Sequence, residues 1–315
     1  MTAREWFIRA QNEGFAIGAF NVDNFEIFKA ICLAGQKKRS PVMMEFSSGE
    51  AGYFGLKNIV DLVANARKQY GIPILLNLDH AKTVEDCMEA LRLRLRSGDF
   101  AVDNSSTSEV KVPHTSEVSF VGFDDIHFDG SELSYEQNVE NTKRVVAAAH
   151  AKNLLVEGEL DKLSGSSEVH TEQIDLEILK KSYSDPLRAA KFVAETGVDI
   201  FASVFGNIHG TFPNQPDLDI ELLKKIKEAL PNTFLSLHGG SGIPAEQIRE
   251  AIKVGRIVKV NVNTEIRQAF KDALNEKIGE NPNEYTYYKL ASDIVMAVTA
   301  VVEGKIDVFG SAGKI

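Results

Sequence analysis

Short apolar runs alternate eight times with longer amphipathic segments, and this alternation limits the possible fold more than any other feature of the sequence. The apolar runs are predicted to be strands at 16–22, 42–46, 72–78, 124–128, 154–159, 200–204, 233–238 and 257–261. Helical patterns lie between them at 27–38, 56–70, 84–94, 135–152, 186–195, 220–230 and 245–254, with another after 264. Alternation of this kind predicts a parallel sheet, and eight repeats favour a closed (β/α)8 barrel over an open sheet.

The chain length suits one large α/β domain. Its 315 residues, 43% of them hydrophobic, are expected to form a single TIM barrel domain over 1–315. Thr2 followed by Glu5 predicts a capped helix ahead of the first strand. Two stretches interrupt the repeat, an insertion at about 97–121 that is rich in Ser and Thr, and 161–183. Loops of this length are usually functional lids or disordered insertions.

Charge and hydropathy exclude several classes of partner. The net charge of -10 argues against nucleic acid, because proteins that bind it gather excess Lys and Arg on one face. The longest apolar runs, such as 72–78, are too short to cross a membrane, and the N-terminus lacks the pattern of a signal peptide. We therefore expect a cytoplasmic protein that binds a small molecule.

Polar side chains gather where the predicted strands end. The carboxyl ends of barrel strands meet at one mouth, so residues there can form one site. Three neutral imidazoles from different strands are a typical ligand set for a catalytic zinc ion with one open coordination position. The residues at the strand ends are Asp79, His80, Asp129, Glu159, His209, His238 and Asn261.

Other histidines and one carboxylate permit a second interpretation. His127 lies inside a predicted strand with the same parity as Asp129, so its side chain could face the same interior, although we do not assign it to metal. Asp129 could simply cap the next helix, because Gly130 and Ser131 follow it. The remaining histidines, His114, His150 and His170, are not assigned to metal.

A glycine-rich turn follows the seventh predicted strand. Residues 239–242 read Gly-Gly-Ser-Gly and precede a helix, so backbone N–H groups and the helix N-terminus could bind a phosphate group. Asn263 and Thr264 open another helix after the eighth strand. Barrels often bind phosphate between these two loops.

The order of these motifs resembles the class II fructose-bisphosphate aldolases over nearly the whole chain. The resemblance rests on GAFNV (18–22), NLDH (77–80), FDGSELS (128–134), VEGEL (156–160), GNIHG (206–210), LHGGSG (237–242), VNVNT (260–264) and VFGSAGK (308–314). It implies reversible cleavage of fructose 1,6-bisphosphate to dihydroxyacetone phosphate and glyceraldehyde 3-phosphate through a zinc-stabilised enediolate, within glycolysis or gluconeogenesis. It also implies a homodimer or homotetramer.

The same resemblance implies a role for each site residue. His80, His209 and His238 would bind the catalytic Zn2+, with Asp129 and Glu159 beside a second divalent or monovalent cation. The implied catalytic groups are Asp79 as acid/base at the C4 hydroxyl, Glu168 at the C3 proton and Asn261 at the enediolate. The implied substrate-binding and phosphate-binding residues are Asn21, Ser47, Gly210, Gly239, Ser241, Asn261, Asn263 and Thr264.

The sequence departs from this family at four places. Asn263 replaces a common Asp, residues 211–213 lack a nearby phosphate-binding Lys, and Asp161 replaces a usual Gly. The fourth departure is the insertion at 97–121. Asp103 within it offers a rival to Asp129, but only Asp129 is followed by the rest of the family motif.

Three alternative functions remain open from the sequence. Lys259 on the eighth predicted strand could form a Schiff base, although the three histidines would then be unexplained. An amidohydrolase would need an HxH pair on the first strand, and none is present. Besides the Schiff-base enzyme, the two functions that remain open are a tagatose-bisphosphate or related ketose-phosphate aldolase, and a metal-binding scaffold without turnover.

Overall fold

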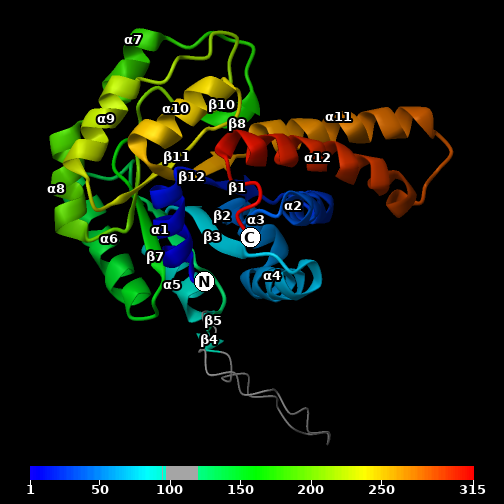
Figure 1. Cartoon of the computed structure of the whole chain (residues 1–315), viewed down its shortest axis with the longest axis horizontal. Coiled ribbons are helices and arrows are strands. Elements are labelled where there is room, and N and C mark those ends of the chain that lie inside the picture. Colours follow the sequence, from blue (N-terminus) through cyan, green and yellow to red (C-terminus); the bar gives the residue numbers. More distant parts are fainter. Residues whose placement is uncertain (94, 97–119) are drawn as a thin grey trace, which may run out of the picture.

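Eight parallel strands close into a barrel in the computed structural model, which describes residues 1–93, 95–96 and 120–315. Neighbours around the barrel follow the order β1-β12-β11-β9-β7-β6-β3-β2, and β2 pairs with β1 to close it (Figure 1). The eight predicted strands are confirmed. They are β1 (Ile17–Asn21), β2 (Val42–Ser47), β3 (Ile74–Ala81), β6 (Asp125–Asp129), β7 (Leu155–Glu159), β9 (Ile200–Ala202), β11 (Phe234–Leu237) and β12 (Ile257–Val262).

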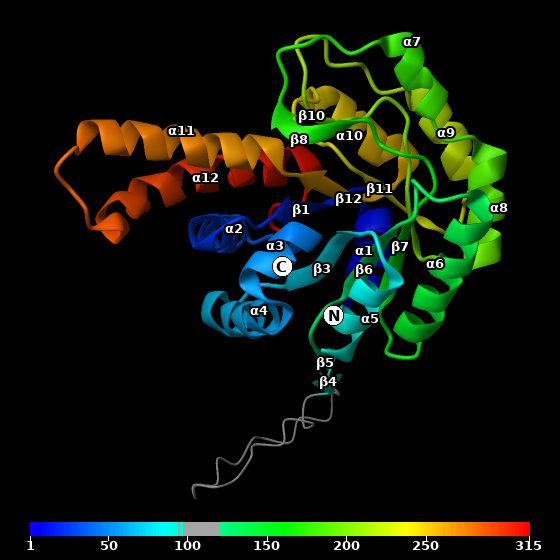
Figure 2. The ribbon, with the colours of Figure 1, turned by 180° about the vertical axis from the view of Figure 1, so that it is seen from behind.

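Helices surround this barrel, and each predicted helix is present. They are α1 (Ala3–Glu13), α2 (Phe25–Lys38), α4 (Leu56–Tyr70), α5 (Val84–Arg92), α6 (Tyr135–His150), α8 (Pro186–Thr196), α9 (Ile220–Ala229), α10 (Ala245–Gly255) and α11 (Thr264–Glu280). Outside the 161–183 stretch, the described residues contain two further helices that were not predicted, α3 (Ser48–Phe54) and α12 (Tyr287–Phe309). α11 and α12 run side by side as an arm that projects from the barrel in both views (Figures 1 and 2).

Successive side chains of each strand point to opposite faces of the barrel sheet, and two separate apolar cores result. Residues of one parity, such as Phe20, Met44 and Leu76, pack between the strands and the helices. Residues of the other parity, such as Met43 and Leu75, face the barrel interior and form a smaller core near its base. Side chains of this second parity become polar toward the carboxyl ends of the strands, which places the polar groups at the mouth.

Helix α1 closes the base of the barrel. Thr2 caps it by accepting from the backbone N–H of Glu5, whose side chain accepts from the Thr2 backbone, as the sequence predicted. The buried side chains of Trp6 and Phe7 belong to the same apolar cluster as the lower interior of the barrel. Water is therefore excluded from this end.

The 97–121 insertion begins and ends at the base as well. It connects α5 to β6, and its flanking residues form the antiparallel pair β4 (Leu95–Arg96) and β5 (Phe120–Val121). Both views place this pair at the opposite end of the molecule from β8 and β10, which lie at the mouth (Figures 1 and 2). Residues 97–119, including Asp103, lie outside the described residues.

The second long stretch, 161–183, contains regular structure. It includes strand β8 (Gly165–Val169), the short helix α7 (Leu176–Leu179) and the 3-10 turn η1 (Lys180–Ser182). β8 pairs in parallel with β10 (His209–Thr211), which follows β9. This two-stranded sheet brings the 161–183 stretch to the mouth beside His209.

Candidate active site

One cavity at the mouth of the barrel collects most of the predicted site residues. Ser167 and Arg267 also line it, although the sequence did not single them out for the site. Asp129, Glu159 and Glu168 are not among its lining residues. The cavity is lined by Asn21, Ser47, Asp79, His80, Ser167, His209, Gly210, His238, Gly239, Ser241, Asn261, Asn263, Thr264 and Arg267.

His80 and His238 turn ring nitrogens toward one another. His80 Nε2 lies 3.2 Å from His238 Nδ1, close to the roughly 3.3 Å expected between two nitrogen ligands of a tetrahedral zinc ion. The opposite ring nitrogens are held by carboxylates, His80 Nδ1 at 2.8 Å from Asp129 Oδ2 and His238 Nε2 at 2.8 Å from Glu157 Oε1. A carboxylate partner of this kind orients a metal-binding imidazole and fixes its tautomer.

The backbone at His80 adopts an uncommon conformation. Its φ is 48°, in the left-handed region that residues other than glycine rarely adopt. Such backbone conformations persist where the surrounding structure imposes them, and they cluster at functional sites. The ring of His80 is thereby directed over the cavity beside Asp79.

Asp79 lies beneath the imidazoles as an ionised carboxylate. Burial alone would raise its pKa, but the charge of His80, a hydrogen bond from His127 and the charges of Lys259 and His238 hold this pKa far below its usual range. Asn21 Nδ2 donates to Asp79 Oδ2 at 3.2 Å. A carboxylate in this state can accept a proton from a substrate hydroxyl group.

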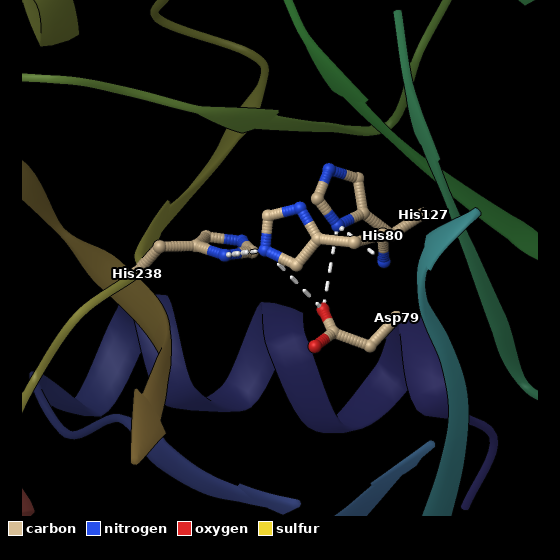
Figure 3. A group of neighbouring side chains, drawn as sticks. All are labelled: Asp79, His80, His127 and His238. Carbon is tan, nitrogen blue, oxygen red and sulfur yellow. Dashed lines mark hydrogen bonds and ion pairs between the residues drawn. The ribbon is translucent and has the colours of Figure 1, made fainter. Parts of the chain in front are cut away.

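His127 belongs to this cluster, although the sequence prediction did not assign it. Its Nδ1 lies 3.4 Å from Asp79 Oδ1, and its Nε2 lies 3.4 Å from Glu159 Oε2. Each of Asp79, His80, His127 and His238 offers a donor atom within 4.8 Å of the others (Figure 3). The shared strand parity with Asp129 was the signal that could have identified His127.

The third predicted zinc ligand, His209, enters the cavity from a different element. It begins β10, which pairs with β8 outside the barrel sheet. Its ring centroid lies 5.0 Å from that of His80 and 6.3 Å from that of His238. Burial lowers the pKa of His209 to about 3, so its ring is neutral, as a metal ligand requires. Two groups of described side chains have possible metal-ligand atoms that all lie within 4.8 Å of one another, and His209 belongs to neither group.

The two residues predicted to lie beside a second cation, Asp129 and Glu159, are also close together. Asp129 and Glu159 are register partners at the ends of β6 and β7, and their side chains are only 3% exposed. With His80 they form a second group whose donor atoms lie within 4.8 Å of one another. Asp129 Oδ2 also lies 2.5 Å from Lys82 Nζ.

Glu168 does not face the cavity. It lies on β8, where its neighbour Ser167 lines the cavity and Glu168 itself is exposed. Since adjacent side chains on a strand point to opposite faces, the present position of β8 directs Glu168 away from the predicted C3 proton. The role predicted for Glu168 is therefore not realised in this arrangement.

A layer of buried charge lies directly below the metal-ligand candidates. Lys259 Nζ lies 2.7 Å from Glu45 Oε1, 2.6 Å from Glu157 Oε2 and 3.9 Å from Asp125 Oδ2. Burial alone would lower the pKa of Lys259, but these three carboxyl groups raise it well above its usual range. An ammonium group held in this way is not a nucleophile, which argues against the Schiff-base alternative.

The predicted phosphate loop requires glycine at its start. Gly239 has a φ of 65°, and a Cβ there would lie 1.9 Å from the Ile208 carbonyl oxygen. Gly240 N donates to the Asn261 carbonyl at 2.8 Å, which joins the loop to β12. Ser241 Oγ accepts from the Glu265 backbone in the first turn of α11, so the two predicted phosphate loops contact each other.

Arg267 is the basic side chain of this cavity. It lies one turn into α11, where its guanidinium pairs with Asp23 at 2.7 Å and with Glu50 at 2.8 Å. Both acids therefore hold the guanidinium at the cavity wall. Arg267 is a candidate for the cationic group that residues 211–213 do not supply.

These donor sets fit the implied zinc ion. Zinc binds imidazole nitrogens, and this cavity offers two of them at ligand separation, a third imidazole and two carboxylates that orient the rings.

None of the helices in the described part of the chain has the length and apolar character needed to span a membrane.

Comparisons of sequence and structure find aldolases that are similar to this chain. A sequence model of the family described as "Fructose-bisphosphate aldolase class-II" matches residues 1–314. The fructose-bisphosphate aldolase of Streptococcus pneumoniae serotype 4 is 37% identical over 327 residues, covering 100% of this chain and 99% of that protein. That of Streptococcus pyogenes serotype M1 is 36% identical over 328 residues with the same coverage. The crystal structure of the YdjI aldolase from Escherichia coli K12 superposes with a TM-score of 0.76 at 28% identity, covering 99% of this chain and 97% of that one.

Proposed function

Because this chain belongs to the class II fructose-bisphosphate aldolase family, we propose that it reversibly cleaves fructose 1,6-bisphosphate to dihydroxyacetone phosphate and glyceraldehyde 3-phosphate. The observation that carries the proposal is the approach of His80 Nε2 and His238 Nδ1 to 3.2 Å above the ionised carboxylate of Asp79. We further propose that the enzyme is cytoplasmic, serves glycolysis or gluconeogenesis and assembles as a homodimer or homotetramer.

Zinc is the proposed cofactor, held by His80, His209 and His238. When bound, it supplies Lewis-acid stabilisation of negative charge on the substrate oxygens. Glu157 and Asp129 orient two of its ligands.

The chain's own groups handle protons and binding. Asp79 accepts the C4 hydroxyl proton as the C3–C4 bond breaks, and Asn21 holds that carboxylate in place. Asn261 Nδ2 lies 3.3 Å from His238 Nδ1, so its amide can donate to the enediolate oxygen at the same point. Glu168 is proposed to exchange the C3 proton, which requires β8 to turn its other face toward the cavity.

Phosphate recognition is assigned to the two loops at the mouth. Gly239 and Ser241 from one loop and Asn263 with Thr264 from the other line the cavity, and Gly210, Asn21 and Ser47 line it as well. Arg267 adds a fixed positive charge beside Thr264. This arrangement suits a doubly phosphorylated substrate even though the chain as a whole is acidic.

The test is an assay of fructose and tagatose 1,6-bisphosphate cleavage by the purified protein, after EDTA and after zinc is restored. Activity lost to EDTA and recovered with zinc is the expected result. Asp79→Asn should lower kcat by about 10²–10⁴ while zinc content stays unchanged. Preference for the tagatose epimer would change the substrate assignment, and no turnover by the zinc-loaded protein would favour the scaffold alternative. Inactivation by borohydride in the presence of substrate would move the chemistry to Lys259.

A further inference from the structure

Two buried carboxylates at the edge of the site need a positive charge. Asp129 and Glu159 pair in register at the ends of β6 and β7, with side chains only 3% exposed. Buried anions this close together are unstable unless a cation neutralises them. Glu159 Oε2 is buried and lies 3.4 Å from His127 Nε2 and 3.6 Å from His80 Nδ1, although neither contact has the geometry of a hydrogen bond.

Lys82 supplies a cation at this point from the chain itself. It follows β3 directly, and its Nζ lies 2.5 Å from Asp129 Oδ2. About half of its side chain is exposed, so the ammonium reaches the buried carboxylate from the rim of the barrel. A lysine stem can lie along the surface while its charged end inserts.

The contacts of Asp129 leave little room for a further ligand. Its Oδ1 accepts from Ser131 N at 3.1 Å and from Ser131 Oγ at 2.6 Å. Its Oδ2 contacts both Lys82 and His80 Nδ1. Although burial would raise the pKa of Asp129, the hydrogen bond to His80, the charges of His127 and His80 and the hydrogen bond to Lys82 hold it far below its usual range. Both oxygens of this carboxylate are therefore engaged.

We propose that the Lys82 ammonium is a tethered cation that replaces the second metal ion of this site. The inference rests on the proposed metal site at His80 and His238, and it determines how many ions that site takes up. A free cation beside Asp129 would lie against the ammonium group and be repelled by it. The chain therefore binds one metal ion, and Asp129 serves as the orienting partner of His80.

Removing the ammonium should open the second position. In Lys82→Met the pair of carboxylates loses the ammonium charge, so Asp129 Oδ2 keeps its contact with His80 Nδ1 but no longer contacts Lys82, and Glu159 Oε2 is still without a hydrogen bond. A divalent cation from solution should then bind between them. Lys82→Arg keeps the positive charge and should behave as the native protein does.

The experiment measures bound metal per chain by mass spectrometry of the elements after equilibrium dialysis against Mn2+ or Zn2+. Lys162→Met is the matched control, because Lys162 pairs with Glu132 on the surface at 2.5 Å, with both side chains more than half exposed. We expect one ion per chain in the native protein, Lys82→Arg and Lys162→Met, and two in Lys82→Met. Adding Glu159→Gln to Lys82→Met should return the count to one.

Two ions in the native protein, or one in folded Lys82→Met, would overturn the inference. Thermal unfolding of each variant establishes that it is folded. Aldolase activity of the same samples separates the two proposals. If the native protein is active and binds two ions, only the role of Lys82 is wrong. If the native protein binds no ion and has no turnover, both the role of Lys82 and the proposed function are wrong.

Discussion

Replacing Lys259 with Met tests whether the charges below the site are paired as the distances indicate. The ammonium lies between Glu45 and Glu157 at 2.7 and 2.6 Å, and none of the three side chains is exposed. The substitution keeps most of the side-chain volume and removes the charge. Two carboxylates are then left in the barrel interior without their counter-ion.

The expected loss of stability is large. Breaking a buried ion pair by removing one partner costs about 3–5 kcal/mol. A chain of 315 residues has an unfolding entropy of roughly 0.7 kcal/mol/K, from about 2.1 cal/mol/K per residue, so Tm should fall by about 5–8 °C. Urea unfolding at pH 7.5 and calorimetry measure the two quantities.

Two further variants isolate the cause. Adding Glu157→Gln to Lys259→Met removes one uncompensated charge, and it should recover part of the lost stability rather than add to the loss. Lys57→Met makes the same replacement in an exposed pair with Asp61 and should cost no more than about 0.5 kcal/mol. A loss below about 1 kcal/mol in Lys259→Met, or an additive loss in the double variant, would refute the pairing.

Two other predictions concern pH and the phosphate loop. Burial raises the pKa of Glu45 from 4.5 to about 7 despite its pairing with Lys259, so the folded protein holds this proton more tightly than the unfolded chain does. The stabilisation is complete below pH 4.5 and is lost as the pH rises through 7. Relative to Glu45→Gln, the native free energy of unfolding should therefore fall by up to about 3 kcal/mol between pH 4.5 and 8 in urea titrations, and a constant difference would contradict the shift. Gly239→Ala should lower the free energy of unfolding by more than about 2 kcal/mol, because φ is positive there and the new Cβ clashes with Ile208. The control Gly304→Ala, on an open face of α12, should raise the free energy of unfolding by about 0.5–1 kcal/mol. Equal unfolding midpoints for the two variants would contradict this account of the loop.

The barrel could be predicted from the sequence because its strands are short, apolar and regularly spaced. Alternation of apolar runs and amphipathic segments located all eight strands within a few residues. The helical pattern after 264 was predicted as one helix with no stated end, because no strand follows it, whereas the structure contains two helices there, α11 and α12. α3 directly continues β2 at Ser48, so no loop residues separate the two elements in the sequence.

The position of candidate residues at strand ends could be predicted from the sequence, whereas His127 inside a strand was not assigned. His80 and His238 end their strands, so topology alone places them at one mouth. His127 lies in the middle of β6, and its side chain faces the barrel interior. The sequence pattern there is the same whether such a residue contacts metal ligands or has a structural role. The pairing of Lys82 with Asp129 depends on the path of the chain after β3, which no local pattern specifies.

The position of Glu168 shows a different limit. The family resemblance implied a catalytic carboxylate at Glu168, but the pairing of β8 with β10 decides which side of that strand meets the cavity. A change of one residue in that pairing exchanges Ser167 for Glu168. The register of two short strands is set by tertiary contacts, and the sequence of either strand alone does not fix it.

Helix α1 covers the base of the barrel, so in the described part of the chain the interior opens toward the mouth. Among the described residues, Trp6 and Phe7 cover the base end of the interior, so the cavity at the mouth is the side from which water and protons approach Lys259, Glu45 and Glu157. A bound bisphosphate would cover that opening. Proton exchange between these three buried groups and the solvent would then be slow until product leaves, so their protonation during turnover would follow the pH at which the substrate was bound.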